Sequence, residues 1–144
     1  MSNQDEVRLC VPARPEFLGL VRVTGAGLAS RLGLTFDQVE DLRLALDEMC
    51  FGLTGTKGRD GTLELHFLLT EEGLTVQGEG HFAEPRTLRL SELSELILDA
   101  LVDKHSSSEG PGGPQFLLVK RRPPLDEEAP LDKEAGNDPA GEGQ

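Results

Sequence analysis

Residues 35–53 read TFDQVEDLRLALDEMCFGL, the most informative stretch for the architecture. Thr35 can cap a helix, and Gln38 stands three residues later, which is the capping-box pattern of a helix N-terminus. The apolar residues that follow recur at spacings of three and four, at Val39, Leu42, Leu46, Met49, Cys50 and Leu53. Such spacing places them on one face. The stretch therefore predicts an amphipathic helix packed against a core.

A strand and another helix are expected before this one. Residues 7–11 alternate apolar and polar side chains, as in a strand with one buried face. Pro12 and Pro15 end that strand, and proline suits the first turn of a helix. A helix is predicted next, because the following residues recur at helical spacing: Phe17, Leu18, Val21, Gly25, Leu28 and Leu32. Gly33 then favours the end of this helix.

The remaining elements predict the fold class. In chain order, we expect a loop at 55–61, strands at 62–69 and 74–77 around a turn at 70–73, a helix at 91–104, a loop at 110–114 and a strand at 115–120. The third helix should face inward with Leu93, Leu96, Ile97, Ala100 and Leu101. The order β-α-α-β-β-α-β does not alternate strictly, which disfavours a doubly wound parallel sheet. It favours an α+β fold, a two-layer α/β sandwich whose mixed, mostly antiparallel sheet is covered on one face by helices.

Composition indicates one domain with disordered ends. We expect a disordered N-terminus at 1–6, a domain at 7–122 and a disordered acidic tail at 123–144. The tail holds seven acidic residues and one basic residue, so it carries −6, half of the formal net charge of −12. Its few apolar residues cannot offset the entropy of ordering. The tail is either a partner-contacting arm or a solubilising extension.

Charge and residue usage exclude several classes. An excess of acidic residues disfavours direct nucleic-acid binding, because phosphates would be repelled. No apolar run suits a membrane span, and no basic region leads into an apolar one, so we expect a cytoplasmic protein. Cys10 and Cys50 are expected to be buried thiols in a reducing compartment. The histidines at 66, 81 and 105 show no ligand spacing, so no metal site is expected.

Two stretches resemble a known family. Residues 11–22, VPARPEFLGLVR, and 37–50, DQVEDLRLALDEMC, resemble the first strand and the two helices of RsbW-type anti-sigma factors. Together with the element order, the resemblance covers most of residues 7–122. Only the first 50 residues match the family in detail. It implies the ATPase fold shared with histidine kinases, Hsp90, gyrase and MutL.

The resemblance also implies partners. These are a bacterial sigma factor and an anti-anti-sigma protein of the STAS type, and the family pattern allows for a homodimer. In the family, the first helix and its surroundings contact partners, which makes Arg14, Glu16 and Arg22 candidate partner-binding residues. The alternative is that these three are ordinary surface residues.

For the helix at 35–53, the resemblance implies a nucleotide site. Glu48 matches the family glutamate that faces ATP and acts as a general base, so it is the candidate catalytic and cofactor-binding residue. Its alternative role is as part of a solvated helix face. Four residues later the family has an asparagine that holds Mg²⁺, and this chain has Gly52. Glycine offers no ligand, so Mg²⁺ is not expected.

The family's adenine motif is also altered. It reads Asp-x-Gly-x-Gly after a hairpin strand, and the nearest match here is VQGEG at 76–80. Gly78 and Gly80 match glycines of the motif, but the aspartate position falls on Gly78 or Gln77; a plain turn is the alternative for this segment. The family's glycine-rich lid corresponds to residues 86–94, which lack glycine. Arg86 or Arg89 there could pair with phosphate, or both could be surface residues.

The sequence therefore predicts an anti-sigma-type binding protein with a degenerate ATP site, where ATP binding is weak or lost. Two alternatives stay open. One is an active ATP-dependent serine kinase that phosphorylates an anti-anti-sigma protein. The other is a nucleotide-free scaffold or dimerisation module.

Overall fold

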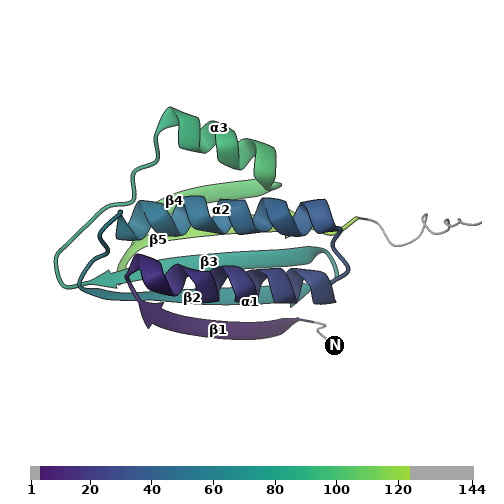
Figure 1. The fold of residues 1–144 in the computed structure, drawn as a ribbon, viewed down its shortest axis with the longest axis horizontal. Helices are drawn as coiled ribbons and strands as arrows, with labels where there is room; N and C mark the ends of the chain where they lie inside the picture. Colours follow the sequence, from purple (N-terminus) through teal and green to yellow (C-terminus); the bar gives the residue numbers. More distant parts are fainter. Residues whose placement is uncertain (1–3, 124–144) are drawn as a thin grey trace, which may run out of the picture.

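The computed structural model describes residues 4–123, which form a five-stranded sheet with helices on one face (Figure 1). The elements are β1 (Asp5–Pro12), a 3₁₀ turn η1 (Pro15–Phe17), α1 (Leu18–Arg31), α2 (Phe36–Thr54), β2 (Gly61–Thr70), β3 (Gly73–Phe82), α3 (Glu92–Leu101), β4 (Lys104–Gly110) and β5 (Gly113–Arg121). The α+β class is confirmed. The expected acidic tail lies outside the described residues from position 124 onward, as do residues 1–3.

The strand order is β1-β2-β3-β5-β4, and every neighbouring pair is antiparallel. The described sheet is thus wholly antiparallel rather than mixed. β4 was not predicted, because its sequence KHSSSEG lacks the apolar alternation of a half-buried strand. It lies at the sheet edge and is held by pairing with β5 across a two-residue turn at 111–112. Its side chains are mostly exposed, and polar side chains on an edge strand help to prevent pairing with another chain.

The helix predicted at 35–53 forms as expected. The Thr35 hydroxyl accepts a hydrogen bond from the Gln38 backbone N–H at 3.2 Å, and the Thr35 N–H donates to the Gln38 side chain at 2.8 Å. This capping box is confirmed. α1 packs closely on α2 because Gly25 has no side chain. A Cβ there would lie 2.6 Å from Leu46 Cδ1.

The third helix differs from its prediction in extent and orientation. It ends at Leu101, and Val102 already has extended backbone. The expected inward residues Leu93, Leu96, Ile97 and Ala100 are exposed, while Leu98 is fully buried and Leu101 half-buried. The helix therefore packs on a different stripe, and its most apolar face meets solvent.

The two cysteines differ from each other in their exposure to solvent. Cys50 is buried in α2, and this burial, reinforced by Asp47, raises the pKa of its thiol to about 12. Cys10 is exposed, because position 10 of β1 points to the sheet face that the helices leave open. The prediction of two buried thiols is therefore correct for Cys50 and wrong for Cys10. No described helix is both long and apolar enough to span a bilayer.

Candidate nucleotide site

Glu48 lies on α2, half-buried where α2 meets the start of α3. The Ser94 hydroxyl donates to its carboxylate, and the Ser91 hydroxyl donates to the Ser94 hydroxyl at 3.1 Å. Ser91 also caps α3 by accepting from the Ser94 backbone N–H at 3.0 Å. The carboxylate thus sits at a helix N-terminus, where negative charge is favoured. In this arrangement Glu48 ties the two helices together.

Gly52, one turn after Glu48, lies against leucine side chains from the segment between β3 and α3. A Cβ at Gly52 would lie 2.7 Å from Leu88 Cδ1 and 3.5 Å from Leu90 Cδ2. Leu88 is buried and belongs to the core. The position therefore offers no metal ligand, and its surroundings are apolar. Sequence analysis missed these two leucines, although their alternation at 88 and 90 is a signal for an apolar contact.

Gly78 and Gly80 lie inside β3, which runs to Phe82 instead of ending at Gln77. The prediction of a turn at this Gly-x-Gly is wrong. Both glycines point to the helix-covered face, where Gly78 pairs with Phe116 of β5. The ring of Phe116 occupies the space that a Cβ at Gly78 would need, and the ring of Phe82 does so at Gly80. Aromatic rings thus pack over the strand at both positions.

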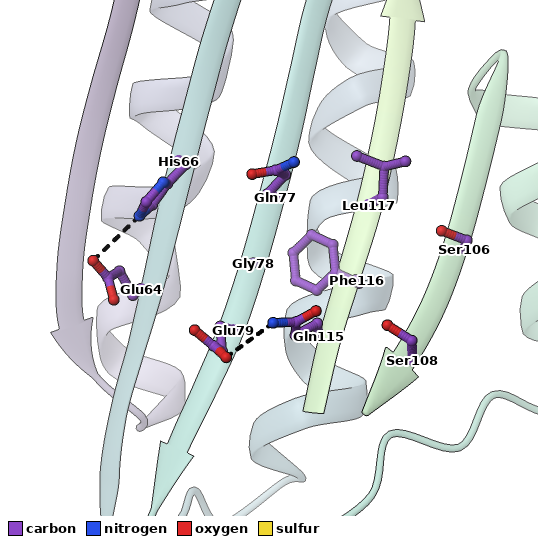
Figure 2. Close-up of a pocket in the computed structure, with 10 residues that line it drawn as sticks. All are labelled: Glu64, His66, Gln77, Gly78, Glu79, Ser106, Ser108, Gln115, Phe116 and Leu117. Atoms are coloured by element: carbon purple, nitrogen blue, oxygen red, sulfur yellow. Dashed lines mark hydrogen bonds and ion pairs between the residues drawn. The ribbon is translucent and has the colours of Figure 1, made fainter. Parts of the chain in front are cut away.

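Gln77 points the other way. It is exposed on the open face of the sheet, where it lines a cavity with residues of β2, β4 and β5 (Figure 2). Because neighbouring residues of a strand face opposite sides, the structure separates Gln77 from Glu48 by the sheet itself. Of the predicted nucleotide-site residues, Glu48, Gly52, Gly78 and Gly80 share the helix-covered side and Gln77 does not.

The segment at 83–91 has no regular structure before Ser91 caps α3. Arg86 and Arg89 are both exposed in it, and Arg86 lies 3.7 Å from the Glu84 carboxylate. Exposed ion pairs of this kind contribute little to stability. Leu88, between the two arginines, and Leu90, directly after Arg89, anchor the segment against α2.

The predicted partner residues surround the start of α1. Arg14 and Glu16 are exposed and 3.6 Å apart, and the Arg14 guanidinium lies 5.3 Å from the centroid of the Phe17 ring. Arg22 instead donates to Asp47 of α2 at 2.7 Å. Arg14 and Glu16 thus stay accessible near the end of β1, while Arg22 already serves to join α1 to α2.

Part of this chain is similar to bacterial proteins named serine-protein kinase RsbW. It is 35% identical over 77 residues to the protein from Bacillus pumilus (strain SAFR-032) and 36% identical over 78 residues to that from Bacillus subtilis (strain 168). These alignments cover 50% and 52% of this chain, and 48% and 49% of those proteins. The chain thus spans about half the length of the curated relatives it matches. No protein-family profile matches the chain.

Proposed function

Because about half of this chain is similar to RsbW proteins, we propose that it is an anti-sigma-type regulator with a degenerate nucleotide site. In this proposal it binds a sigma factor, an anti-anti-sigma protein of the STAS type, or both, and ATP binding is weak or lost. One observation carries the proposal. Apolar side chains cover Gly52 and Gly78. By the resemblance, Gly52 takes the place of the family's magnesium-binding asparagine, and the adenine-binding aspartate falls on Gly78 or Gln77.

Catalysis of phosphoryl transfer depends on positioning and on charge neutralisation, mostly by metal ions. Gly52 supplies no ligand, and Leu88 lies against it. A metal-bound phosphate at this place would have to displace Leu88, and exposing a buried leucine costs about 1.5–3 kcal/mol. Glu48 keeps a carboxylate, but Ser94 already holds it. These features support a binding role over an active serine kinase.

The outer surface of the helices supports partner binding. It exposes large apolar side chains on all three helices, namely Leu20, Val23, Phe36, Leu44, Phe51, Leu93, Leu96 and Ile97. Of these, Leu93, Leu96 and Ile97 lie on one face of α3, and adjoining exposed apolar groups are typical of surfaces that contact other proteins. The formal net charge of −12 suits a basic surface on the partner, since complementary charge speeds association.

Nucleotide titration tests the degenerate site. The full chain is titrated calorimetrically with ATP and with ADP, each with and without Mg²⁺. We expect no saturable binding, or weak binding that Mg²⁺ does not tighten, because position 52 has no ligand atom. Tight Mg²⁺-dependent binding, followed by transfer of the γ-phosphate to a serine of a co-expressed antagonist, would instead establish the kinase alternative.

Affinity capture of the full chain in its native cell, read by mass spectrometry, tests the partners. We expect a sigma factor or a STAS-type protein. Arg14→Glu should weaken that complex about ten-fold or more, because it reverses a charge at the proposed contact. Arg31→Glu is the matched control, since Arg31 is exposed at the opposite end of α1. Recovery of neither partner class would contradict the proposal and favour the scaffold alternative.

A further inference from the structure

The open face of the sheet carries a cluster of histidine and glutamate side chains on the β2–β3 hairpin. Glu64 and His66 lie on β2, and Glu79 and His81 on β3. In the antiparallel register Glu64 stands directly opposite Glu79, and His66 opposite Gln77. All four side chains belong to the face that the helices do not cover. This cluster is separate from the surroundings of Glu48.

The pairing of Glu64 with Glu79 needs an explanation. Like charges directly opposite each other on neighbouring strands destabilise a sheet. A third carboxylate, Glu6 of β1, lies 3.2 Å from His66 Nδ1. The one arginine in ion-pair contact with this group in the described chain is Arg8, which pairs with Glu6 and not with Glu64 or Glu79. A positive group between Glu64 and Glu79 would remove their repulsion.

His81 lies between the two carboxylates. Its Nε2 atom is 3.3 Å from Glu64 Oε1 and 3.4 Å from Glu79 Oε1. Both distances exceed the roughly 2.7–2.9 Å of a charge-assisted N–H···O bond, so a single N–H shared between the two oxygens would bond each of them only weakly. Ligand atoms around one tetrahedral Zn²⁺ are about 3.3 Å apart, given metal–ligand distances of about 2.0–2.1 Å. The observed spacing therefore matches three atoms that share one cation.

The outer oxygens of both glutamates are already held. Glu64 Oε2 lies 3.2 Å from His66 Nε2, and Glu79 Oε2 accepts from the Gln115 side chain at 3.0 Å (Figure 2). Each carboxylate therefore presents its other oxygen to His81. Metal sites are oriented by such outer contacts.

The cluster is bordered by a cavity and by a turn. Glu64 and Glu79 line a cavity of about 390 Å³, together with Gln77 and polar residues of β4 and β5 (Figure 2). On another side the β4–β5 turn approaches closely. A Cβ at Gly112 would be 2.8 Å from Glu79 Oε2 and 3.0 Å from His81 Cε1. The cavity leaves room for a water molecule or a further ligand at a fourth coordination position.

From this geometry we infer that Glu64, Glu79 and His81 bind one divalent transition-metal cation, of the class represented by Zn²⁺. Their candidate ligand atoms all lie within 4.8 Å of one another. Imidazole and carboxylate ligands with an open fourth position suit Zn²⁺. His66 and Gln115 act as positioning residues that orient the two carboxylates. The histidines show no ligand spacing in the sequence because the site depends on strand register.

Zinc titration of the full chain tests the site. The chain is freed of any affinity tag, treated with a chelator and dialysed, and Zn²⁺ binding is measured by calorimetry. Co²⁺ absorption then reports the coordination geometry. We expect one Zn²⁺ per chain and a tetrahedral Co²⁺ spectrum. Glu79→Gln and His81→Gln should each weaken binding at least about ten-fold, and Gln115→Ala about ten-fold, as loss of an outer contact does.

His105→Gln is the matched control. His105 lies on β4, where its ring contacts Asp99 of α3 at 2.7 Å, on the helix-covered side of the sheet. This variant should bind Zn²⁺ as the unmodified chain does. Circular dichroism of each metal-free variant checks that it folds. The inference is overturned if the unmodified chain shows no saturable binding, if His81→Gln folds and binds equally well, or if His105→Gln removes binding.

Discussion

Gly52 and Gly78 show how a missing side chain changes what a position can do. Each glycine leaves a space that an apolar group from another part of the chain fills, Leu88 at Gly52 and Phe116 at Gly78. Dispersion contacts and burial then replace any polar interaction that a longer side chain would make there. At both positions the absence of a side chain thus lets apolar groups pack closely against the backbone.

Gly78→Ala tests this packing. We expect it to destabilise the protein by about 1–3 kcal/mol, because the added methyl group must displace the buried Phe116 ring. Gly27→Ala is the control, since a Cβ at Gly27 of α1 meets nothing within 4 Å. Alanine there should stabilise the helix by up to about 1 kcal/mol. Urea unfolding measures both, and equal effects of the two substitutions would contradict the packing described for Phe116.

Among the elements, α3 shows why apolar periodicity did not predict orientation. Its sequence holds two stripes at helical spacing. One stripe, which faces solvent, consists of Leu93, Leu96, Ile97 and Ala100. The other, which faces the protein, consists of Ser94, Leu98 and Leu101. The inward stripe is less apolar, but Ser94 bonds Glu48 and Leu98 enters the core. Contacts with α2 decide the orientation.

Two substitutions on α3 test which of its two stripes packs against the protein. Leu98→Ala should cost about 2–5 kcal/mol of unfolding free energy, because Leu98 is fully buried and leaves a cavity. Leu96→Ala, two residues earlier and 65% exposed, should change stability by no more than about 0.5 kcal/mol. Thermal or urea unfolding monitored by circular dichroism makes the comparison. If Leu96→Ala instead lowered the unfolding free energy more than Leu98→Ala, the inward face predicted from the sequence would be correct.

In the molecule as a whole, Lys120 links the sheet to two helices. It is a buried residue of β5, and its ammonium group donates to the Leu101 carbonyl at the end of α3 at 2.6 Å. The same group lies 3.4 Å from the Asp41 carboxylate of α2. A cation is favourable at a helix C-terminus, where carbonyl groups lack partners. One side chain thus holds β5, α2 and α3 together.

Lys120→Met tests this link. The substitution keeps most of the side-chain volume but removes the donor, so the Leu101 carbonyl loses its partner. We expect a loss of about 1–3 kcal/mol in unfolding free energy, with faster amide exchange at the end of α3. Arg121→Met is the control, because Arg121 is the next residue and its side chain is exposed. Unchanged stability and exchange in Lys120→Met would show that other contacts hold α3.

Much of this protein follows from the sequence alone. The capping box at Thr35 and Gln38, the apolar spacing of α1 and α2, the β2–β3 hairpin and the α+β class all agree with the structure. The resemblance to RsbW proteins agrees with the comparisons. These features were predictable because they depend on residues close together in the chain, and local periodicity and capping are direct consequences of helix and strand geometry.

Only the tertiary structure decided the rest. The polar edge strand β4, the orientation of α3 and the Gly-x-Gly inside β3 depend on partners far away in the sequence. The same is true of Leu88 against Gly52 and of His81 between Glu64 and Glu79. Strand register brings residues 64, 79 and 81 together, and register is set by pairing across the whole sheet. No spacing along the chain encodes that arrangement, because the physical contacts are between strands.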